Sequence, residues 1–222
     1  MSLAKTSCSS LGLTLKGGFS PLEALVLGRP NAGKSLFLVN FAAYLGLKEI
    51  RVEVLDGEGR ARHQRLSIEL ARRHLVSHTP YKTTALQTIH VDITTAKTAH
   101  RLTLTDTVGL TEEISGELVI RRAIAIALSR ISQGPMVLHV VDASAVGYSA
   151  IETVSLVDDG IARYAGSIST YAILATKMDK ESAKAGLERI RERFQGYPII
   201  PISGITRRGF KDVKTFILRH WQ

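Results

Sequence analysis

The sequence predicts an α/β fold with a mostly parallel, six-stranded sheet, one antiparallel strand, and helices on both faces. Apolar strand-like runs alternate with helical patterns along the chain, which is typical of βα units in a parallel sheet. Two of these runs, residues 86–93 and 101–105, are separated only by a short polar segment. No helical crossover fits there, so the two strands should pair antiparallel. The chain has 222 residues, enough for one domain with a sizeable core.

The individual elements follow from local patterns in the chain. Short apolar runs bounded by turn residues indicate strands, and apolar residues at helical spacing indicate helices. The expected strands are residues 22–27, 86–93, 101–105, 136–141, 171–175 and 197–200. The expected helices are residues 36–45, 117–131, 151–164, 181–194 and 210–221.

Residues 48–81 do not fit this minimal plan and are expected to form an insertion. Residues 50–55 alternate like a short strand, residues 56–59 read as a turn, and residues 60–76 read as a helix. On a helix, four arginines would gather on one side, opposite the apolar residues. These are Arg62, Arg65, Arg72 and Arg73. The pattern fits either a solvated face of a packed helix or a docking surface for RNA or another partner.

Bulk properties favour a cytoplasmic protein with a polyanionic partner. Residues 1–20 lack the apolar core of a secretory signal and are expected to be a flexible lead-in. The one cysteine, Cys8, cannot form a disulfide within one chain, which fits a reducing cytosol. No run is apolar and long enough to span a bilayer. The net charge of +9 favours nucleic acid, ribosomes or an anionic membrane surface as partner.

A phosphate-binding loop is predicted at residues 28–35, which read GRPNAGKS and fit the pattern G-x-x-x-x-G-K-[ST]. The loop follows an expected strand and opens an expected helix. Its glycines let backbone N–H groups cradle phosphate oxygens, and the helix N-terminus favours the same anion. Lys34 can reach the terminal phosphates, and Ser35 can ligate Mg²⁺. The expected contacts are Gly28, Asn31, Ala32, Gly33, Lys34, Ser35 and Leu36.

Two further motifs would act on the metal and the last phosphate. Residues 106–109 read DTVG at the end of a strand, so Asp106 would hold Mg²⁺, usually through water, and Gly109 would offer its N–H to the γ-phosphate. Upstream, Thr84 matches by position a threonine that closes over Mg²⁺ and the γ-phosphate when nucleotide is bound.

Residues 176–179, TKMD, predict recognition of guanine. The Asp179 carboxylate can accept from both the ring N1–H and the exocyclic amino group of guanine, whereas adenine has neither donor there. Lys177 would lie across the base plane. Thr176 stands where the common form of the motif has Asn. Ser203 and Gly204 follow a strand and would complete the base pocket, with the Gly204 N–H on guanine O6, or else form only a loop turn.

Together these motifs resemble the translation-factor-related class of small GTPases, and most of all the Era, Obg and HflX families. The resemblance includes the phosphate loop and the segments LTDTVGL, VLHVVDAS and, more loosely, YKTTALQTIHVDI. It extends over residues 22–221 and implies a P-loop NTPase fold that binds GTP or GDP with Mg²⁺. The extra domains of these families have no counterpart here. A nearly bare GTPase domain is therefore expected at residues 21–222, with the insertion at about 48–81.

The resemblance implies hydrolysis of GTP to GDP and phosphate, with catalytic contributions from Lys34, Thr84, Gly109 and Asn31. Many small GTPases have a water-orienting glutamine where this chain has Leu110, so slow intrinsic turnover is expected. In related potassium-stimulated GTPases, an asparagine at the position of Asn31 helps to bind K⁺; the alternative is that Asn31 is simply a good turn residue. A nucleotide-binding scaffold with little turnover is the competing function.

Overall fold

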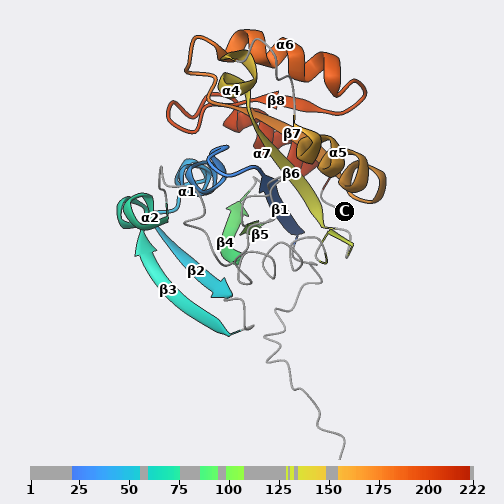
Figure 1. Ribbon diagram of the computed structural model, residues 1–222. Coiled ribbons are helices and arrows are strands. Elements are labelled where there is room, and N and C mark those ends of the chain that lie inside the picture. The colour runs from blue at the N-terminus through green and yellow to red at the C-terminus, as the bar shows by residue number, and fades with distance from the viewer. Residues whose placement is uncertain are drawn as a thin grey trace, which may run out of the picture.

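One eight-stranded sheet with helices on both faces forms the molecule in the computed structural model (Figure 1). The structure describes residues 22–55, 60–75, 86–94, 99–107, 129, 131–132, 135–148 and 155–220. The strand order is β3-β2-β4-β5-β1-β6-β7-β8. The predicted α/β class is confirmed, but the sheet has two more strands than the six expected. The predicted lead-in at residues 1–20 and most of the predicted helix 117–131 lie outside the described residues.

The secondary structure begins with β1 and its following helix, directly around the predicted phosphate loop. The strands are β1 (Leu22–Gly28), β2 (Glu49–Leu55), β3 (Ala61–Ser67), β4 (Leu86–Thr94), β5 (Ala99–Asp106), β6 (Met136–Asp142), β7 (Tyr171–Thr176) and β8 (Ile199–Pro201). The helices are α1 (Lys34–Tyr44), α2 (Ile68–Leu75), α4 (Ala143–Tyr148), α5 (Leu156–Ile168), α6 (Ala183–Arg193) and α7 (Phe210–Arg219).

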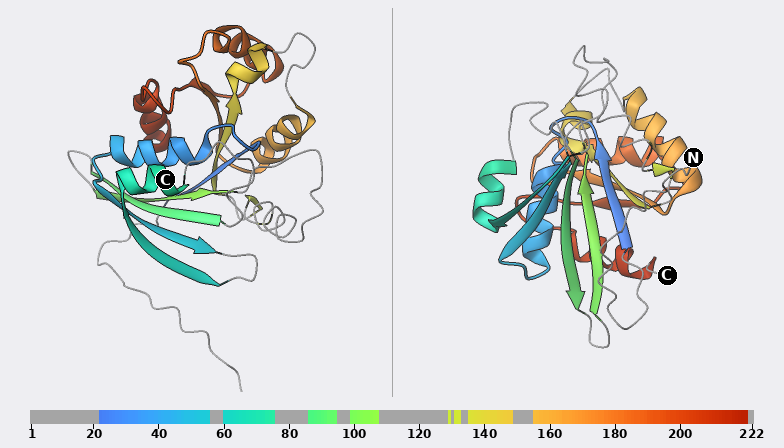
Figure 2. Two further views of the ribbon diagram at one scale, coloured as in Figure 1. Left: turned by 60° about the vertical axis from the view of Figure 1, so that its left-hand side comes forward. Right: turned by 90° about the horizontal axis from the view of Figure 1, so that it is seen from below.

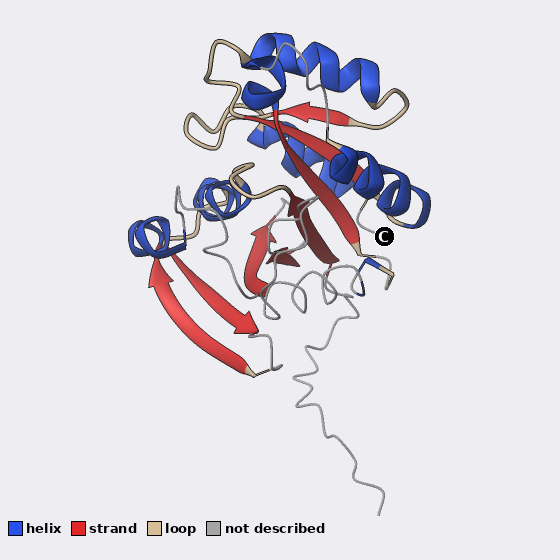
Figure 3. Cartoon of the chain, in the orientation of Figure 1, coloured by secondary structure: helices blue, strands red, loops and turns tan. Residues whose placement is uncertain are grey.

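The parallel half of the sheet is buried between two layers of helices (Figure 3). Strand β1 pairs in parallel with β5 and β6, and β7 and β8 continue the same direction. Because side chains alternate along a strand, Val26 faces one core and Leu27 faces the other. Helices α1, α2 and α7 cover the first core, and α4, α5 and α6 cover the second. The carboxyl ends of the parallel strands therefore meet at one edge.

The other half of the sheet is antiparallel. Strands β4 and β5 pair antiparallel, as predicted, and β2 pairs antiparallel with both β4 and β3. Figure 2 shows β2 and β3 extending the sheet beyond β4, with α1 and α2 side by side on one face. We call β2, β3 and α2 together the edge unit. Its inner face adds buried Ile50, Val52 and Leu66 to the first core.

The single helix predicted over residues 60–76 is wrong. Residues 61–67 form β3, and the helix begins only at Ile68. Of the seven β3 residues, only Leu66 is buried. The apolar residues that suggested a longer helix therefore do not form a buried helical face before Ile68. Pairing with β2 instead satisfies the backbone groups of residues 61–67 that face β2. Arg62 and Arg65 are therefore strand residues on opposite faces of β3, while Arg72 and Arg73 belong to α2. The prediction that the four arginines gather on one side of a helix is wrong.

The region after β6 also differs from the prediction. The short helix α4 was not expected, and the helix predicted at residues 151–164 appears as α5, which begins at Leu156. The Ser155 hydroxyl accepts a hydrogen bond from the backbone N–H of Asp158, which is the local reason for this start. Within the described residues, no helix is long and apolar enough to cross a membrane.

Helices α4 and α6 cross so closely that only glycine fits at the contact. A Cβ atom built on Gly186 would lie 1.8 Å from the carbonyl oxygen of Ala143, and one on Gly147 would lie 1.8 Å from that of Ser182. The approach also lets Ser182 donate its hydroxyl to the Ser144 carbonyl, at 3.0 Å. This contact fixes α6 directly after the TKMD motif.

We predict that Gly186→Ala lowers the free energy of unfolding by about 2 kcal/mol or more, because α4 and α6 must separate to admit the methyl group. The matched control is Gly160→Ala in α5, where a Cβ atom meets nothing within 4 Å. That change should raise stability by up to about 1 kcal/mol through helix propensity alone. Denaturant unfolding of both variants provides the measurement, and equal effects would contradict the close-packing argument.

Candidate functional site

The loop between β1 and α1 has the backbone shape that the phosphate-loop pattern predicts. Gly28, Asn31 and Gly33 have positive φ angles of 143°, 57° and 99°. A Cβ atom on Gly28 would lie 2.2 Å from the Val140 carbonyl oxygen, so only glycine fits there. Because α1 begins at Lys34, its first-turn N–H groups open toward this loop. The turn is therefore suited to an anion.

Lys34 lies folded over the loop and is buried. Its Nζ donates to the carbonyl oxygens of Gly28, at 3.1 Å, and Arg29, at 2.8 Å. Burial lowers the pKa of Lys34, and the carboxylates of Asp106 and Asp158 oppose that shift. An ammonium group has three donors, so one remains for an acceptor inside the loop. The lysine can thus both brace the loop and contact a bound phosphate.

Asp106 and Ser35 form a site with the chemistry of a hard cation. The Ser35 hydroxyl donates to Oδ2 of Asp106 at 2.5 Å. Burial raises the pKa of Asp106 to about 6, against the opposing effects of Lys34 and of hydrogen bonds from Ser35 and the Thr107 backbone. Its Oδ1 is buried without a partner among the described residues. A buried carboxylate oxygen that lacks a partner beside a hydroxyl fits Mg²⁺, which prefers oxygen ligands.

Thr176 joins the end of β7 to the phosphate loop. Its Oγ1 lies 2.7 Å from the Ala32 carbonyl oxygen and 3.1 Å from that of Val141. The hydroxyl has one proton, so it donates to one carbonyl at a time. Thr176 departs from the common Asn, yet its side chain reaches the loop. The first residue of the TKMD motif therefore positions the loop as well as the residues that follow it.

The next motif position, Lys177, is held by a neighbouring carboxylate. Lys177 has a left-handed backbone, with φ 59°, and its Nζ pairs with Oδ2 of Asp142 at 2.5 Å. Asp142 is fixed in turn by the Ser144 hydroxyl and the Ala145 N–H. Sequence reasoning missed Asp142, although it ends the strand next to β7. An acidic residue at that edge was the available signal.

Ser203 lies beside Asp179, and Gly204 follows it in the same loop. The buried Ser203 donates its hydroxyl to Oδ1 of Asp179 at 2.5 Å, and its oxygen accepts from the Thr206 N–H. Gly204 contacts α1: the Asn40 amide donates to its carbonyl oxygen at 2.6 Å. These contacts make residues 203–208 an ordered loop around an exposed carboxylate. Asn40 was not anticipated, because nothing in its sequence position marks it.

The structure brings most of the predicted site residues to one edge of the sheet. The phosphate loop follows β1, Asp106 ends β5, and the TKMD motif and the 203–208 loop follow β7 and β8. Ligands bind at the carboxyl ends of parallel strands in folds of this kind. Thr84, Gly109 and Leu110 lie outside the described residues, so their predicted roles remain predictions.

Comparison with known proteins gives one family and several similar folds. Residues 23–177 match the family described as 50S ribosome-binding GTPase. No curated protein sequence matches the chain.

Among solved structures, the similar folds include an Era variant from Aquifex aeolicus bound to GDP and aluminium fluoride (TM-score 0.57, 16% identity, 90% of this chain and 56% of that chain). Another is Era with MgGDPNP and a segment of 16S ribosomal RNA (TM-score 0.56, 16% identity, 92% of this chain and 58% of that chain). A third is the G domain of the T. maritima FeoB iron transporter (TM-score 0.54, 14% identity, 91% of this chain and 100% of that chain). The chain thus spans a little over half the length of the Era chains, and these likenesses establish the fold.

We predict that Thr176→Val lowers the free energy of unfolding by about 1–3 kcal/mol, because it leaves the buried Ala32 carbonyl without its hydrogen bond. Thr176→Ser retains the hydroxyl and removes one methyl group, at a cost of about 0.8 kcal/mol. Amide exchange in residues 28–33 should quicken in the valine variant and not in the serine variant. Equal exchange in both would argue that the hydroxyl does not hold the loop.

Proposed function

Since this chain belongs to the family of 50S ribosome-binding GTPases, we propose that it binds GTP with Mg²⁺ and hydrolyses it to GDP and phosphate as a molecular switch. One observation carries the proposal. The Thr176 hydroxyl connects the TKMD motif to the carbonyl of Ala32 in the loop, so a base-reading carboxylate and a phosphate cradle belong to one rigid site. A nucleotide with both a guanine and a phosphate chain fits that site.

The phosphate chain lies along the loop between β1 and α1. Backbone N–H groups at the start of α1 face the anion, and Lys34 supplies a buried positive charge. Its two carbonyl contacts hold the ammonium at the loop, ready for the β- and γ-phosphates. Because this environment excludes water, the charge acts more strongly on a phosphoryl group than it would in solvent.

Ser35 and Asp106 are the residues that would hold Mg²⁺. Mg²⁺ held there would supply positive charge next to the phosphates. Oδ1 of Asp106 has no hydrogen-bond partner among the described residues, so this oxygen is available to a cation or its water. Thr84 and Gly109 complete this part of the proposal as contacts to Mg²⁺ and the γ-phosphate.

Guanine is read by Asp179, with Lys177 along the base and Gly204 at O6. Ser203 holds one carboxylate oxygen of Asp179, and Asp142 holds the Lys177 ammonium. Both base contacts are therefore oriented before the nucleotide arrives, which reduces the entropy lost on binding.

Base specificity follows from Asp179. Asp179→Ala should raise the Kd for GDP at least about a hundredfold, because two hydrogen bonds to a charged group are lost. Asp179→Asn presents one donor and one acceptor. It should therefore favour xanthosine diphosphate (XDP) over GDP, because the 2-oxo group of xanthine accepts a hydrogen bond where the 2-amino group of guanine donates one. Competition of GDP, XDP and ADP against a fluorescent nucleotide measures both. Unchanged GDP affinity in the alanine variant would contradict the proposed base contact.

Turnover is proposed to depend on K⁺ through Asn31, which lies exposed in the loop. A potassium ion there would add positive charge where an arginine finger acts in other GTPases. Phosphate release from GTP with Mg²⁺ should be about tenfold faster in KCl than in equal NaCl, and Asn31→Ala should abolish the difference. Equal rates in the two salts would exclude potassium stimulation. Negligible turnover in every salt would favour a nucleotide-binding scaffold, the function to which Leu110 points.

We further propose that the edge unit contacts ribosomal RNA. Arg62, Arg65 and Arg73 are exposed on β3 and α2. Arg65 pairs with Glu49 and Arg73 with Glu69, but exposed ion pairs contribute little, so these arginines are available to phosphates. The family is described as 50S ribosome-binding, which supports a partner on the large subunit. An Era structure that shares this fold holds a segment of 16S ribosomal RNA, which supports ribosomal RNA as the kind of ligand.

Replacing Arg62, Arg65 and Arg73 by glutamate should weaken binding to purified 50S subunits at least about tenfold and reduce its salt dependence. Nucleotide affinity should not change. Arg72 is left intact because it contacts Asn40. The control reverses the charges of Arg163 on α5 and of Lys184 and Arg191 on α6, two helices that cover the second core and not the edge unit. An equal loss in the control would show that net charge, and not the edge unit, determines binding.

A further inference from the structure

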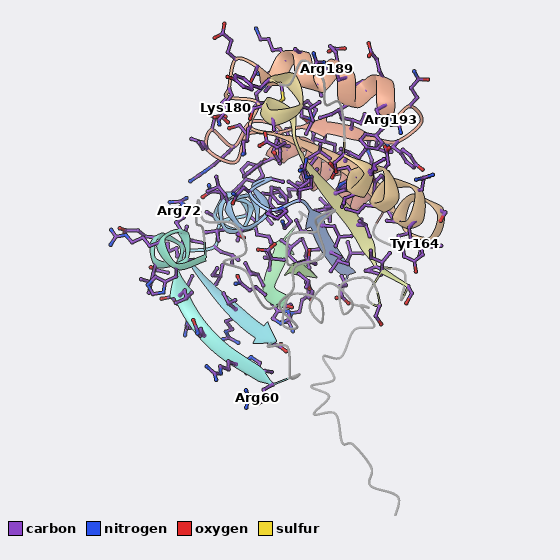
Figure 4. All side chains as sticks on the ribbon, viewed as in Figure 1. Arg60, Arg72, Tyr164, Lys180, Arg189 and Arg193 are labelled. Carbon is purple, nitrogen blue, oxygen red and sulfur yellow. The ribbon has the colours of Figure 1, made fainter. Side chains whose placement is uncertain are left out.

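A chain of side chains links the edge unit to the predicted base site. Arg72 on α2 donates its Nε to Oδ1 of Asn40 on α1 at 2.6 Å. The Asn40 amide donates in turn to the carbonyl oxygen of Gly204, also at 2.6 Å. Arg72 therefore reaches the 203–208 loop through one intermediate residue. Figure 4 labels Arg72 on α2 and Arg60 at the other end of β3.

The geometry points to a role for this contact: we propose that α2 sets the lifetime of the bound guanine nucleotide, with Arg72 as the positioning residue that holds Gly204 through Asn40. The inference rests on the proposed function, in which Gly204 contacts guanine O6. It adds a control point for that contact outside the nucleotide motifs.

The orientation of the Asn40 amide is fixed by its partners. An arginine only donates hydrogen bonds and a backbone carbonyl only accepts them, so the oxygen must face Arg72 and the nitrogen must face Gly204. Asn40 is only 5% exposed, which leaves little access for water to replace a lost partner. Removal of Arg72 would leave a buried amide oxygen unsatisfied and free the amide to turn away from Gly204.

Gly204 needs such a contact more than another residue would. It lacks a side chain, so its backbone has wide conformational freedom. A Cβ atom there would lie 3.2 Å from the Leu36 side chain, so a bulkier residue would crowd α1. On one side, Ser203 donates its N–H to the Arg208 carbonyl at 3.1 Å and its hydroxyl to Asp179. On the other side, the Asn40 amide restrains Gly204. The base contact is thus restrained from both directions.

The first test compares nucleotide release. Arg72→Leu and Asn40→Ala should each speed release of fluorescent GDP about tenfold, and the double variant should be no faster than Asn40→Ala, because both changes break one chain of contacts. Arg72→Lys, which can still donate, should restore part of the slow release. His74→Leu is the control on α2, since His74 is exposed on the same helix and belongs to neither proposed contact surface; its release rate should equal that of the wild type.

A second readout separates positioning of Gly204 from general loosening of the fold. The diphosphate of 2-aminopurine riboside retains the 2-amino group, but it has no O6 for the Gly204 N–H and no N1–H for Asp179. The comparison therefore uses only the change in its release rate between the wild type and Arg72→Leu. Its release should change little in Arg72→Leu, so the preference for GDP over this analogue should fall by about the same factor as GDP release rises. Equal acceleration of both nucleotides, or additive effects in the double variant, would overturn the inference.

The same experiment distinguishes the two levels of the proposal. A wild-type protein that does not retain GDP would refute the proposed function itself. If the wild type retains GDP and prefers guanine, but Arg72→Leu releases GDP no faster, only the role of α2 is refuted.

Discussion

The hydrogen bond between the Thr176 hydroxyl and the Ala32 carbonyl is the interaction on which the candidate site depends. It joins the end of β7 to the loop after β1, two segments that are 144 residues apart in the chain. The parallel strands place both segments at one sheet edge, but β6 lies between β1 and β7. The Thr176 hydroxyl therefore adds a direct contact between the phosphate loop and the TKMD motif across that intervening strand.

Buried charge is the second constraint on this edge. Lys34 and Asp106 are both nearly inaccessible to solvent. Burial lowers the pKa of Lys34 and raises the pKa of Asp106, and the charge of each residue opposes the shift of the other. Such a pair contributes little net stability to a fold, since desolvation offsets its attraction. It is better understood as part of a site in which a bound anion and a cation complete the charge balance. Oδ1 of Asp106, which has no partner in the described part of the chain, fits that interpretation.

The edge unit changes how a partner could act on the site. Strands β2 and β3 widen the sheet, and α2 returns against α1, where Arg72 meets Asn40. Binding free energies are reciprocal, so a ligand that draws Arg72 away from Asn40 must also bind more weakly when the 203–208 loop is ordered by nucleotide. The arrangement connects α2 of the edge unit, through Arg72 and Asn40, to the proposed base contact at Gly204.

The sequence by itself determined the fold class, the antiparallel pairing of β4 with β5, and the places of Lys34, Ser35, Asp106 and Asp179. These rest on local chemistry: glycines that admit positive φ, a strand before a helix, and a carboxylate at a strand end. The tertiary structure alone decided that residues 61–67 form a strand, because the open edge of β2 supplies the backbone partners that a helix would otherwise supply internally. It also decided the contacts of Asn40, Arg72 and Asp142, since hydrogen bonds between segments far apart in the chain leave no periodic signal in the sequence.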